Sequence, residues 1–316
     1  MTGPWIKQIL ALRGRKAQRF CQHESHLSMR KKQSHKFAGR QNARQQPPKS
    51  PQQRQRRTPR PAPQPTLKLP RDGVLVWGRH AAEAVLANPQ RKLTAIYLTE
   101  DAAAWLAAKP HQAVLPEVQI MDRAALDQAL TATNSGDEKI VHQGIVLVAR
   151  PLTPPHLEDW LGSDLPPRPV VILLDQITDS RNIGAIMRSA RAFGAAAMIT
   201  TDRNCPDENA IMLRAASGAA EQIPLIRVTN LARAMETLQD NGFTLAAMTA
   251  YGDAPITRLA GEDRLGIVMG AEGKGLRRLT LERSDCQISI DINPDAESLN
   301  VSTAAAIALF AAGRRH

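Results

Sequence analysis

The stretch "VVILLDQITDSRNIGAIMRSARAFGAAAMIT", residues 170–200, predicts a strand, a helix and a second strand in close succession. Residues 170–175 form an apolar run that is typical of a buried strand, and residues 182–194 have helical spacing that ends at a glycine. Residues 195–200 are apolar again and predict the next strand. Strands that alternate with helices in this way predict an α/β fold, with a parallel sheet covered by helices on both faces.

The same alternation continues to the C-terminus. Further strands are predicted at 223–228, 243–250, 265–270 and 286–292, and further helices at 207–216, 230–242 and 298–313. Ligands of such sheets bind where the strands end. The segments that directly follow the strands are therefore the places to look for functional residues.

A second, smaller α/β pattern precedes this one. Strands are predicted at 74–77, 93–99, 117–121 and 142–149, and helices at 79–88, 101–109 and 122–130. Repeated Pro-Pro steps around a short helix then mark a linker. We expect four parts: a tail (1–70), a small domain (73–150), a linker (151–169) and a second domain (170–316).

The basic charge of the chain lies in the tail. Up to Arg71 there are 18 Lys and Arg against one acidic residue, Glu24, which gives +17, whereas the remainder has 23 basic and 29 acidic residues and a charge of −6. The tail is rich in Gln, Pro and Arg and poor in apolar residues, so we expect it to be disordered. It is either an electrostatic arm for RNA or only a solubilising segment. Met29 is an alternative start of the chain.

Other features of the composition exclude several classes of protein. No apolar run approaches the roughly 18 to 20 residues that span a bilayer, and no secretory signal is visible, so neither a membrane protein nor a secreted one is expected. The three cysteines are widely separated, and no His, Cys and carboxylate cluster has metal-ligand spacing, so we expect no disulfide framework and no metal. A reducing compartment fits best, and an Arg-rich, acid-poor start also fits an organellar transit peptide.

The stretch "VMGAEGKGLRRL", residues 268–279, looks at first like a phosphate-binding loop. A Walker loop requires Gly-Lys-Ser/Thr after its first glycine and four residues, but Gly270 leads to Gly275 and Leu276. The dinucleotide pattern G-x-G-x-x-G fails as well, because Arg278 occupies the third glycine position. The bare backbone of this loop must serve another ligand.

Two further segments follow predicted strands: "LLDQITDSRNIGAIMRSARAFG" (173–194) and "ISIDINPDAESLNVSTAAAIALF" (288–310). In the first, Asn182 could simply cap the helix, and Arg188 could belong to a solvated helix face. In the second, Ser298 or Asn300 could cap an alanine-rich terminal helix. Each segment taken alone is a weak indication of function.

Together, the three segments resemble the three ordered motifs of the SpoU (TrmH-like) RNA 2'-O-ribose methyltransferases of the SPOUT superfamily. The resemblance covers residues 73–313 and is closest to the bacterial 23S rRNA guanosine-2'-O-methyltransferase subfamily. It rests on "VWGRHAAEAVL", "VHQGIVLVA", "EQIPLIRVTNLARAM", "LGIVMGAEGKGLRRLT" and "SLNVSTAAAIALF", which occur in this order.

The resemblance implies a trefoil-knotted catalytic domain that binds S-adenosyl-L-methionine. It places cofactor contacts at Gly270, Ile290 and Leu299, with Thr249, Met269 and Gly275 adjacent. Glycines at this loop would let the backbone lie flush against the cofactor. Two departures from the family pattern affect the pocket: Ser180 and Arg181 replace the usual Pro-x of the first motif, and Asp291 to Pro294 reshape the third.

The resemblance also implies the reaction. Arg188 would lie at the target ribose or phosphate with Asn182 supporting it, and Glu272, Ser298 and Asn300 would complete the pocket. The implied substrate is a guanosine in the peptidyl-transferase region of 23S rRNA. A tRNA 2'-O-methyltransferase and a non-catalytic RNA-binding ribosome-assembly protein are the alternatives.

The remaining implications concern partners. The small domain resembles a ribosomal-protein-like RNA-binding domain, in which Arg79 and His80 could touch RNA, unless His80 only caps or packs its helix. A homodimer is expected from the family, and the small residues of the helix at 301–312 would permit close packing.

Overall fold

The computed structural model describes residues 66–109, 115–116, 118–133 and 140–313. The chain divides into two units, residues 1–66 and 67–316, and the helices and strands of the described residues lie in the second. The prediction that the basic tail is disordered lies mainly outside the described residues. Its last residues are an exception, because Leu67 is buried in a hydrophobic core and Lys68 N donates to Tyr97 Oη at 2.7 Å. The tail therefore ends earlier than residue 70.

The N-terminal lobe contains a four-stranded sheet in the order β1-β4-β2-β3. Its strands are β1 (Val74–Trp77), β2 (Leu93–Leu98), β3 (Val118–Ile120) and β4 (Ile145–Ala149). Strand β4 pairs antiparallel with β1 and β2, and β3 pairs parallel with β2. Its helices are α2 (Arg79–Ala87), α3 (Glu100–Ala107) and α4 (Arg123–Thr133). One core cluster joins α4 to this sheet through Leu126 and Leu130.

Strand β4 begins three residues later than the sequence predicts. His142 is buried, its Nε2 lies 2.9 Å from Asp127 Oδ1, and its Nδ1 accepts from Gly144 N at 3.0 Å. Gln143 and Gly144 have φ values of 53° and 80°, which are turn conformations. A Cβ on Gly144 would lie 2.3 Å from Thr99 Oγ1, so this turn requires a glycine.

The C-terminal lobe contains a seven-stranded parallel sheet in the order β7-β6-β5-β10-β8-β11-β9. Its strands are β5 (Val170–Asp175), β6 (Ala197–Thr201), β7 (Leu225–Val228), β8 (Thr244–Met248), β9 (Ala254–Pro255), β10 (Leu265–Gly270) and β11 (Cys286–Ser289). The α/β class and the parallel sheet predicted from the sequence are confirmed. The trefoil knot stays a prediction.

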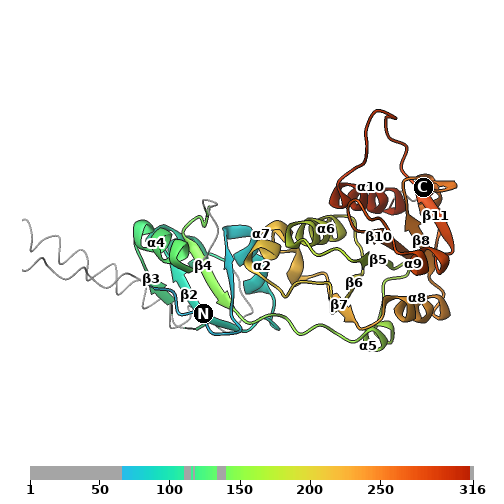
Figure 1. Ribbon diagram of the computed structural model, residues 1–316. Helices are drawn as coiled ribbons and strands as arrows, with labels where there is room; N and C mark the ends of the chain where they lie inside the picture. Colours follow the sequence, from blue (N-terminus) through green and yellow to red (C-terminus); the bar gives the residue numbers. More distant parts are fainter. Residues whose placement is uncertain (1–65, 110–114, 117, 134–139, 314–316) are drawn as a thin grey trace, which may run out of the picture. The chain divides into compact units, whose positions relative to one another are not determined.

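Helices cover both faces of this sheet (Figure 1). On one side, α5 (Leu157–Leu161) and α8 (Leu231–Asp240) pack on the strands around Trp160, Met235 and Phe243. On the other side lie α6 (Ser180–Ala192), α7 (Ala210–Ala216) and α10 (Val301–Gly313), with α6 packed against both α7 and α10. The short helix α9 (Arg278–Glu282) follows β10 and has no counterpart among the predicted elements.

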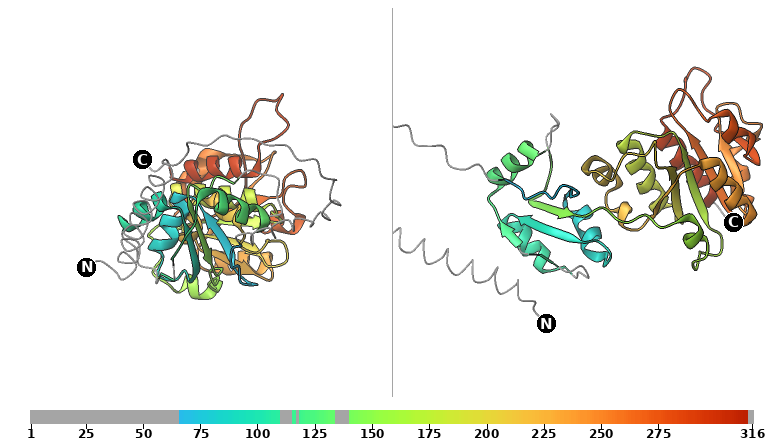
Figure 2. Two further views of the ribbon diagram at one scale, coloured as in Figure 1. Left: turned by 90° about the vertical axis from the view of Figure 1, so that its left-hand side faces the viewer. Right: turned by 60° about the horizontal axis from the view of Figure 1, so that its bottom comes forward.

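The strand order places a topological switch beside β5. The chain runs outward from β5 to β6 and β7, then returns so that β10 inserts between β5 and β8. All strands of this sheet are parallel, so the carboxyl ends of β5, β10, β8 and β11 meet at one edge. Ligand sites of open α/β sheets form at such switch points. Beyond β11, residues 291–298 are all exposed and stand out from the lobe before α10 begins (Figures 1 and 2).

A buried ion-pair network joins Arg91 of the N-terminal lobe to two glutamates of the C-terminal lobe. The side chain of Arg91, between α2 and β2, is fully buried and contacts Glu208 Oε1 and Glu221 Oε1, each at 2.5 Å. Burial alone would lower the pKa of Arg91, but hydrogen bonds to Glu221 and Glu208 outweigh it and raise the pKa above its ordinary value. Arg91 is therefore a charged structural residue.

Candidate active site

A pocket of about 640 Å³ opens at the carboxyl ends of β8, β10 and β11. The six residues that the resemblance assigns to the cofactor all line it, namely Thr249, Met269, Gly270, Gly275, Ile290 and Leu299. Glu272 and Ser298 also line it. The structure thus brings together residues from four segments that are up to 50 positions apart along the chain.

The wall of this pocket is a tight glycine turn. Gly275 N donates to Ala271 O at 2.9 Å, and Gly273 and Gly275 have φ values of 76° and 63°. The turn folds back on the end of β10, so that a Cβ on Gly270 would lie 2.4 Å from Gly275 C and 2.5 Å from Leu276 N. Because both of these are backbone atoms, no side-chain rotation relieves the clash. Only glycine fits at position 270.

The opposite side of the pocket combines apolar surface with one unused polar atom. Ile290 and Leu299 are half-buried and supply flat aliphatic surface. Thr249 Oγ1 is buried and finds no hydrogen-bond partner among the described residues. A buried hydroxyl without a partner is costly, so its place in a pocket points to a ligand that supplies the missing hydrogen bond. Apolar surface with a few fixed polar groups is typical of small-molecule sites.

A polar cluster lies beside the pocket and joins all three sequence segments. Glu272 Oε1 accepts hydrogen bonds from Asn300 Nδ2 at 2.5 Å, Asn182 Nδ2 at 3.2 Å and Val301 N at 3.3 Å. Asn300 Nδ2 also donates to Asn182 Oδ1 at 3.1 Å. Three of the predicted catalytic residues therefore form one hydrogen-bonded unit, centred on a carboxylate oxygen.

The capping alternatives for these asparagines have different outcomes. Helix α6 begins at Ser180, and its cap is Asp179, whose side chain accepts from Arg181 N at 2.8 Å. Asn182 lies inside the first turn, so the interpretation of Asn182 as the cap is wrong. Asn300 Oδ1, by contrast, accepts from Ser302 N at 2.9 Å at the start of α10. Asn300 both caps α10 and donates to Glu272.

Arg188 stands apart from this unit. It lies on α6 six residues after Asn182, is exposed, and makes no hydrogen bond or ion pair with any residue that the structure describes. It does not line the pocket. The structure therefore assembles the other predicted site residues but leaves Arg188 as an unpaired cation on the same helix.

Several residues at the pocket were missed by the sequence analysis. Tyr251, which is 97 % exposed, and Lys274 both line it. So do Leu276 and Leu281, on either side of the start of α9. Lys274 and Leu276 lie in the glycine-rich motif, which marked the region but not these side chains, and Tyr251 lies in no motif.

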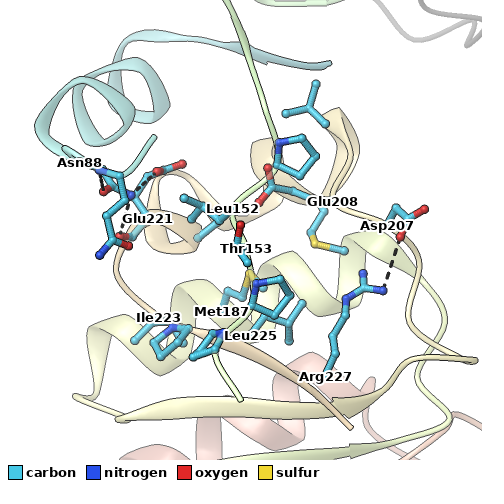
Figure 3. A pocket seen from close by; sticks show the side chains of 18 of the residues that line it. Asn88, Leu152, Thr153, Met187, Asp207, Glu208, Glu221, Ile223, Leu225 and Arg227 are labelled. Atoms are coloured by element: carbon cyan, nitrogen blue, oxygen red, sulfur yellow. Dashed lines mark hydrogen bonds and ion pairs between the residues drawn. The ribbon is translucent and has the colours of Figure 1, made fainter. Parts of the chain in front are cut away.

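A larger pocket, of about 910 Å³, lies elsewhere and contains none of the predicted site residues. Figure 3 shows Leu152 and Thr153 of the linker in it, with Arg227 near Asp207 at 3.5 Å. Glu221 is also at this pocket, where its Oε2 accepts from Asn88 Nδ2 at 2.8 Å. Glu208 and Glu221 of this pocket are both paired with the buried Arg91, which is typical of a structural contact region. The smaller pocket is the better candidate for chemistry.

Other kinds of site find no support in the described part of the chain. No three His, Cys, Asp or Glu side chains gather there to hold a metal ion. Burial raises the pKa of the thiols of Cys205 and Cys286, so neither is a thiolate nucleophile at neutral pH. Within the same residues, no helix is both long enough and apolar enough to cross a membrane.

Comparison with known proteins agrees with the motifs. The SpoU rRNA Methylase family matches residues 169–310. The 23S rRNA (guanosine-2'-O-)-methyltransferase RlmB of Escherichia coli is 34 % identical over 250 residues, which is 76 % of this chain and 98 % of that protein. RlmB of Vibrio parahaemolyticus is 41 % identical over 249 residues, which is 76 % of this chain and 96 % of that protein.

Solved structures show the same fold. The SpoU methyltransferase AviRb from Streptomyces viridochromogenes, in complex with the cofactor AdoMet, aligns with a TM-score of 0.62 and 23 % identity, over 77 % of this chain and 90 % of that one. An AdoMet-bound rRNA methyltransferase from Sinorhizobium meliloti aligns with a TM-score of 0.62 and 20 % identity, over 77 % and 87 % of the two chains. With these relatives, and with three motifs that meet in the polar cluster beside the pocket, this chain belongs to the SpoU rRNA methylase family.

Proposed function

We propose that this protein transfers a methyl group from S-adenosyl-L-methionine to the ribose 2'-hydroxyl of a guanosine in 23S rRNA. The observation that carries the proposal is the pocket at the switch point, in a chain that is 34–41 % identical to RlmB enzymes over almost their whole length. The peptidyl-transferase region is the part of the 23S rRNA that the resemblance indicates.

The residues of the pocket fit this cofactor. The Gly270 cradle leaves room for a ligand to lie against bare backbone, and Thr249 Oγ1 has a hydrogen bond to offer. Ile290 and Leu299 are suited to the faces of an adenine ring. The bound cofactor would supply an electrophilic methyl group on a sulfonium. Attack by the 2'-oxygen would form a C–O bond, break the C–S bond and release S-adenosylhomocysteine, and the hydroxyl proton would leave to water.

Arg188 is assigned an electrostatic role in this reaction. A guanidinium stays protonated in proteins, so Arg188 does not act as the base. As an unpaired, exposed cation on α6 it is free to bind the phosphate beside the target ribose and to stabilise the developing alkoxide. Glu272 holds Asn182 and Asn300 in place and keeps this side of the pocket rigid.

A homodimer is the second part of the proposal. Phe193 at the end of α6 and Phe310 on α10 are 40 % and 47 % exposed, and their rings stack edge to face with centroids 5.8 Å apart. On the same helix as Phe310, Ala306 and Ile307 are half-buried. An exposed aromatic pair beside small residues suits close packing with a second copy of the chain. Light scattering should give a dimer for the natural protein and a monomer for Phe310→Asp, and a monomeric natural protein would refute it.

The setting of the reaction follows from the substrate. We place the protein in the bacterial cytoplasm, where 23S rRNA is made, with an organelle as the alternative. The small lobe and the basic N-terminal segment are assigned to RNA binding, on the basis of the resemblance and of the charge of +17 up to Arg71.

A transfer assay tests the reaction. Purified protein is incubated with methyl-labelled S-adenosyl-L-methionine and either unmodified 23S rRNA or unmodified tRNA, and the RNA is digested to nucleosides. We expect label only in 2'-O-methylguanosine from 23S rRNA. Label in tRNA alone would identify a tRNA enzyme, and cofactor-independent RNA binding without transfer would support the non-catalytic alternative.

A further inference from the structure

The buried carboxylate of Asp175 is not among the residues assigned to the site. Asp175 is the last residue of β5 and is fully buried. Three groups from one segment donate to it: Arg277 Nε at 2.7 Å, Thr280 Oγ1 at 2.8 Å and Arg277 N at 3.1 Å. A buried carboxylate is stable only when such partners are in place, so this arrangement is strongly determined.

The donors to Asp175 flank the wall of the cofactor pocket. Arg277 directly follows Leu276, and Thr280 directly precedes Leu281, and both leucines line the pocket. Asp175 itself is paired in register with Gly270, the cradle residue, across the β5 and β10 strands. One side chain thus connects the end of β10 with the far end of the loop that leaves it.

This loop has little rigidity of its own. Gly273 and Gly275 have positive φ values, and a Cβ at either position would meet no atom within 4 Å, so neighbouring side chains do not confine them. The hydrogen bond from Gly275 N to Ala271 O closes the turn. Glu272 attaches the start of the loop to Asn300, but this bond does not hold the part of the loop that follows the turn. Glycine-rich backbone is conformationally free, so an external attachment must hold it.

We propose that Asp175 is a positioning residue that fixes the segment 271–281 against β10 and keeps the cofactor pocket in its binding shape. This inference rests on the proposed function of the pocket. A site that is already formed binds without ordering its own loop, so the attachment raises cofactor affinity without touching the cofactor. Asp175 contributes to binding and not to the chemical step.

The test compares three variants of the full chain. In Asp175→Asn the shape is kept, but one oxygen becomes an NH₂ that faces donors. Thr280→Val removes a single donor and keeps the two bonds from Arg277. The matched control is Asp285→Asn, because Asp285 also accepts from a neighbouring strand, at Leu245 N (2.7 Å), and from Gln239 Nε2 (2.9 Å), but lies outside the pocket.

Three measurements are made: calorimetric affinity for S-adenosylhomocysteine, KM and kcat for S-adenosyl-L-methionine, and hydrogen exchange of the loop amides without ligand. For Asp175→Asn we expect about a tenfold loss of affinity, equivalent to about 1.4 kcal/mol, with a matching rise in KM and an unchanged kcat. Thr280→Val should shift affinity in the same direction by a smaller factor. Amides of residues 273–277 should exchange faster in both variants but not in Asp285→Asn.

Opposite results would overturn the inference. For Asp175→Asn, any one of three results would do so: affinity within twofold of the natural protein, a lowered kcat with KM unchanged, or loop amides that exchange at the rate found in Asp285→Asn. If Asp175→Asn does not fold, Thr280→Val decides by the same criteria. Failure of the unaltered protein to bind S-adenosylhomocysteine would instead refute the proposed function, and loop exchange would still report on the attachment.

Discussion

Replacing Gly270 by alanine adds one methyl group at the end of β10 and should damage the pocket specifically. The new Cβ would lie 2.4 Å from Gly275 C, 2.5 Å from Leu276 N and 2.6 Å from Gly275 O. All three atoms belong to the backbone of the glycine turn. The turn must therefore move as a whole, away from the position in which it forms the pocket wall.

The size of the effect follows from this geometry. Ordinary contacts of a Cβ begin near 3.4 Å, so the turn must retreat by about 1 Å. Overpacking of this kind typically costs about 1–3 kcal/mol. If the displaced wall transfers this cost to ligand binding, affinity falls by about 5- to 150-fold, at about 1.4 kcal/mol for each tenfold change.

Calorimetric titration with S-adenosylhomocysteine measures the loss, and Gly266→Ala is the control. Gly266 is on the same strand, and its Cβ would lie 2.4 Å from Leu245 Cδ2, the end of a side chain that can rotate away from the pocket. Thermal unfolding should show that both variants are destabilised, but only Gly270→Ala should lose affinity. Equal affinities for Gly270→Ala and the natural protein would refute the assignment of this turn to the cofactor.

Further changes test the other assignments. Arg188→Ala should lower kcat by about 10²–10³-fold, which is the usual cost of losing one charge-stabilising donor, and should leave affinity for S-adenosylhomocysteine nearly unchanged. Activity within a few-fold of the natural protein in single-turnover assays would contradict its role. Arg91→Ala should lower the free energy of unfolding in urea by about 3–5 kcal/mol, because it leaves the buried Glu221 without its ion pair. The control variant Arg168→Ala breaks only an exposed pair with Asp263 and should lower it by at most about 1 kcal/mol. Deletion of residues 1–65 should weaken RNA binding and flatten its salt dependence, and an unchanged slope in filter-binding assays would make this segment a bystander.

The regular elements were the most predictable part of the molecule. The strands at β1, β5 and β10 have the predicted bounds, because each is a short apolar run that a glycine, a proline or a polar turn interrupts. The start of β4 was not predictable in this way. His142 and Gln143 precede the apolar run, but they belong to a turn. This turn depends on the contact between His142 and Asp127 of α4, which lies 15 positions away in the sequence.

The order of the strands in the sheet could not be predicted from local sequence patterns either. Insertion of β10 between β5 and β8 joins residues about 95 positions apart, and no local pattern specifies such a pairing. Helix α9 was also missed, since its cap, Arg277, makes no side-chain capping bond to the helix and instead reaches Asp175.

The candidate site could be located through its motifs but not through isolated residues. Asn182 and Asn300 are each common helix-start residues, and their shared partner Glu272 is visible only in the fold. In the sequence, Asp175 is only the polar residue that ends a predicted strand. No neighbouring residue indicates that its hydrogen-bond donors, Arg277 and Thr280, follow the glycine loop. Tyr251 lines the pocket without any pattern that would have predicted it.

The most direct test of the central claim is a map of ribose methylation in cellular RNA, with and without the gene. The account predicts that deletion removes one 2'-O-methylguanosine from 23S rRNA, in the peptidyl-transferase region. A plasmid copy of the gene should restore it, and a copy carrying Arg188→Ala should not. Loss of a tRNA methyl group with the 23S pattern unchanged would contradict the substrate, and an unchanged pattern in all RNAs would contradict the enzymatic activity itself.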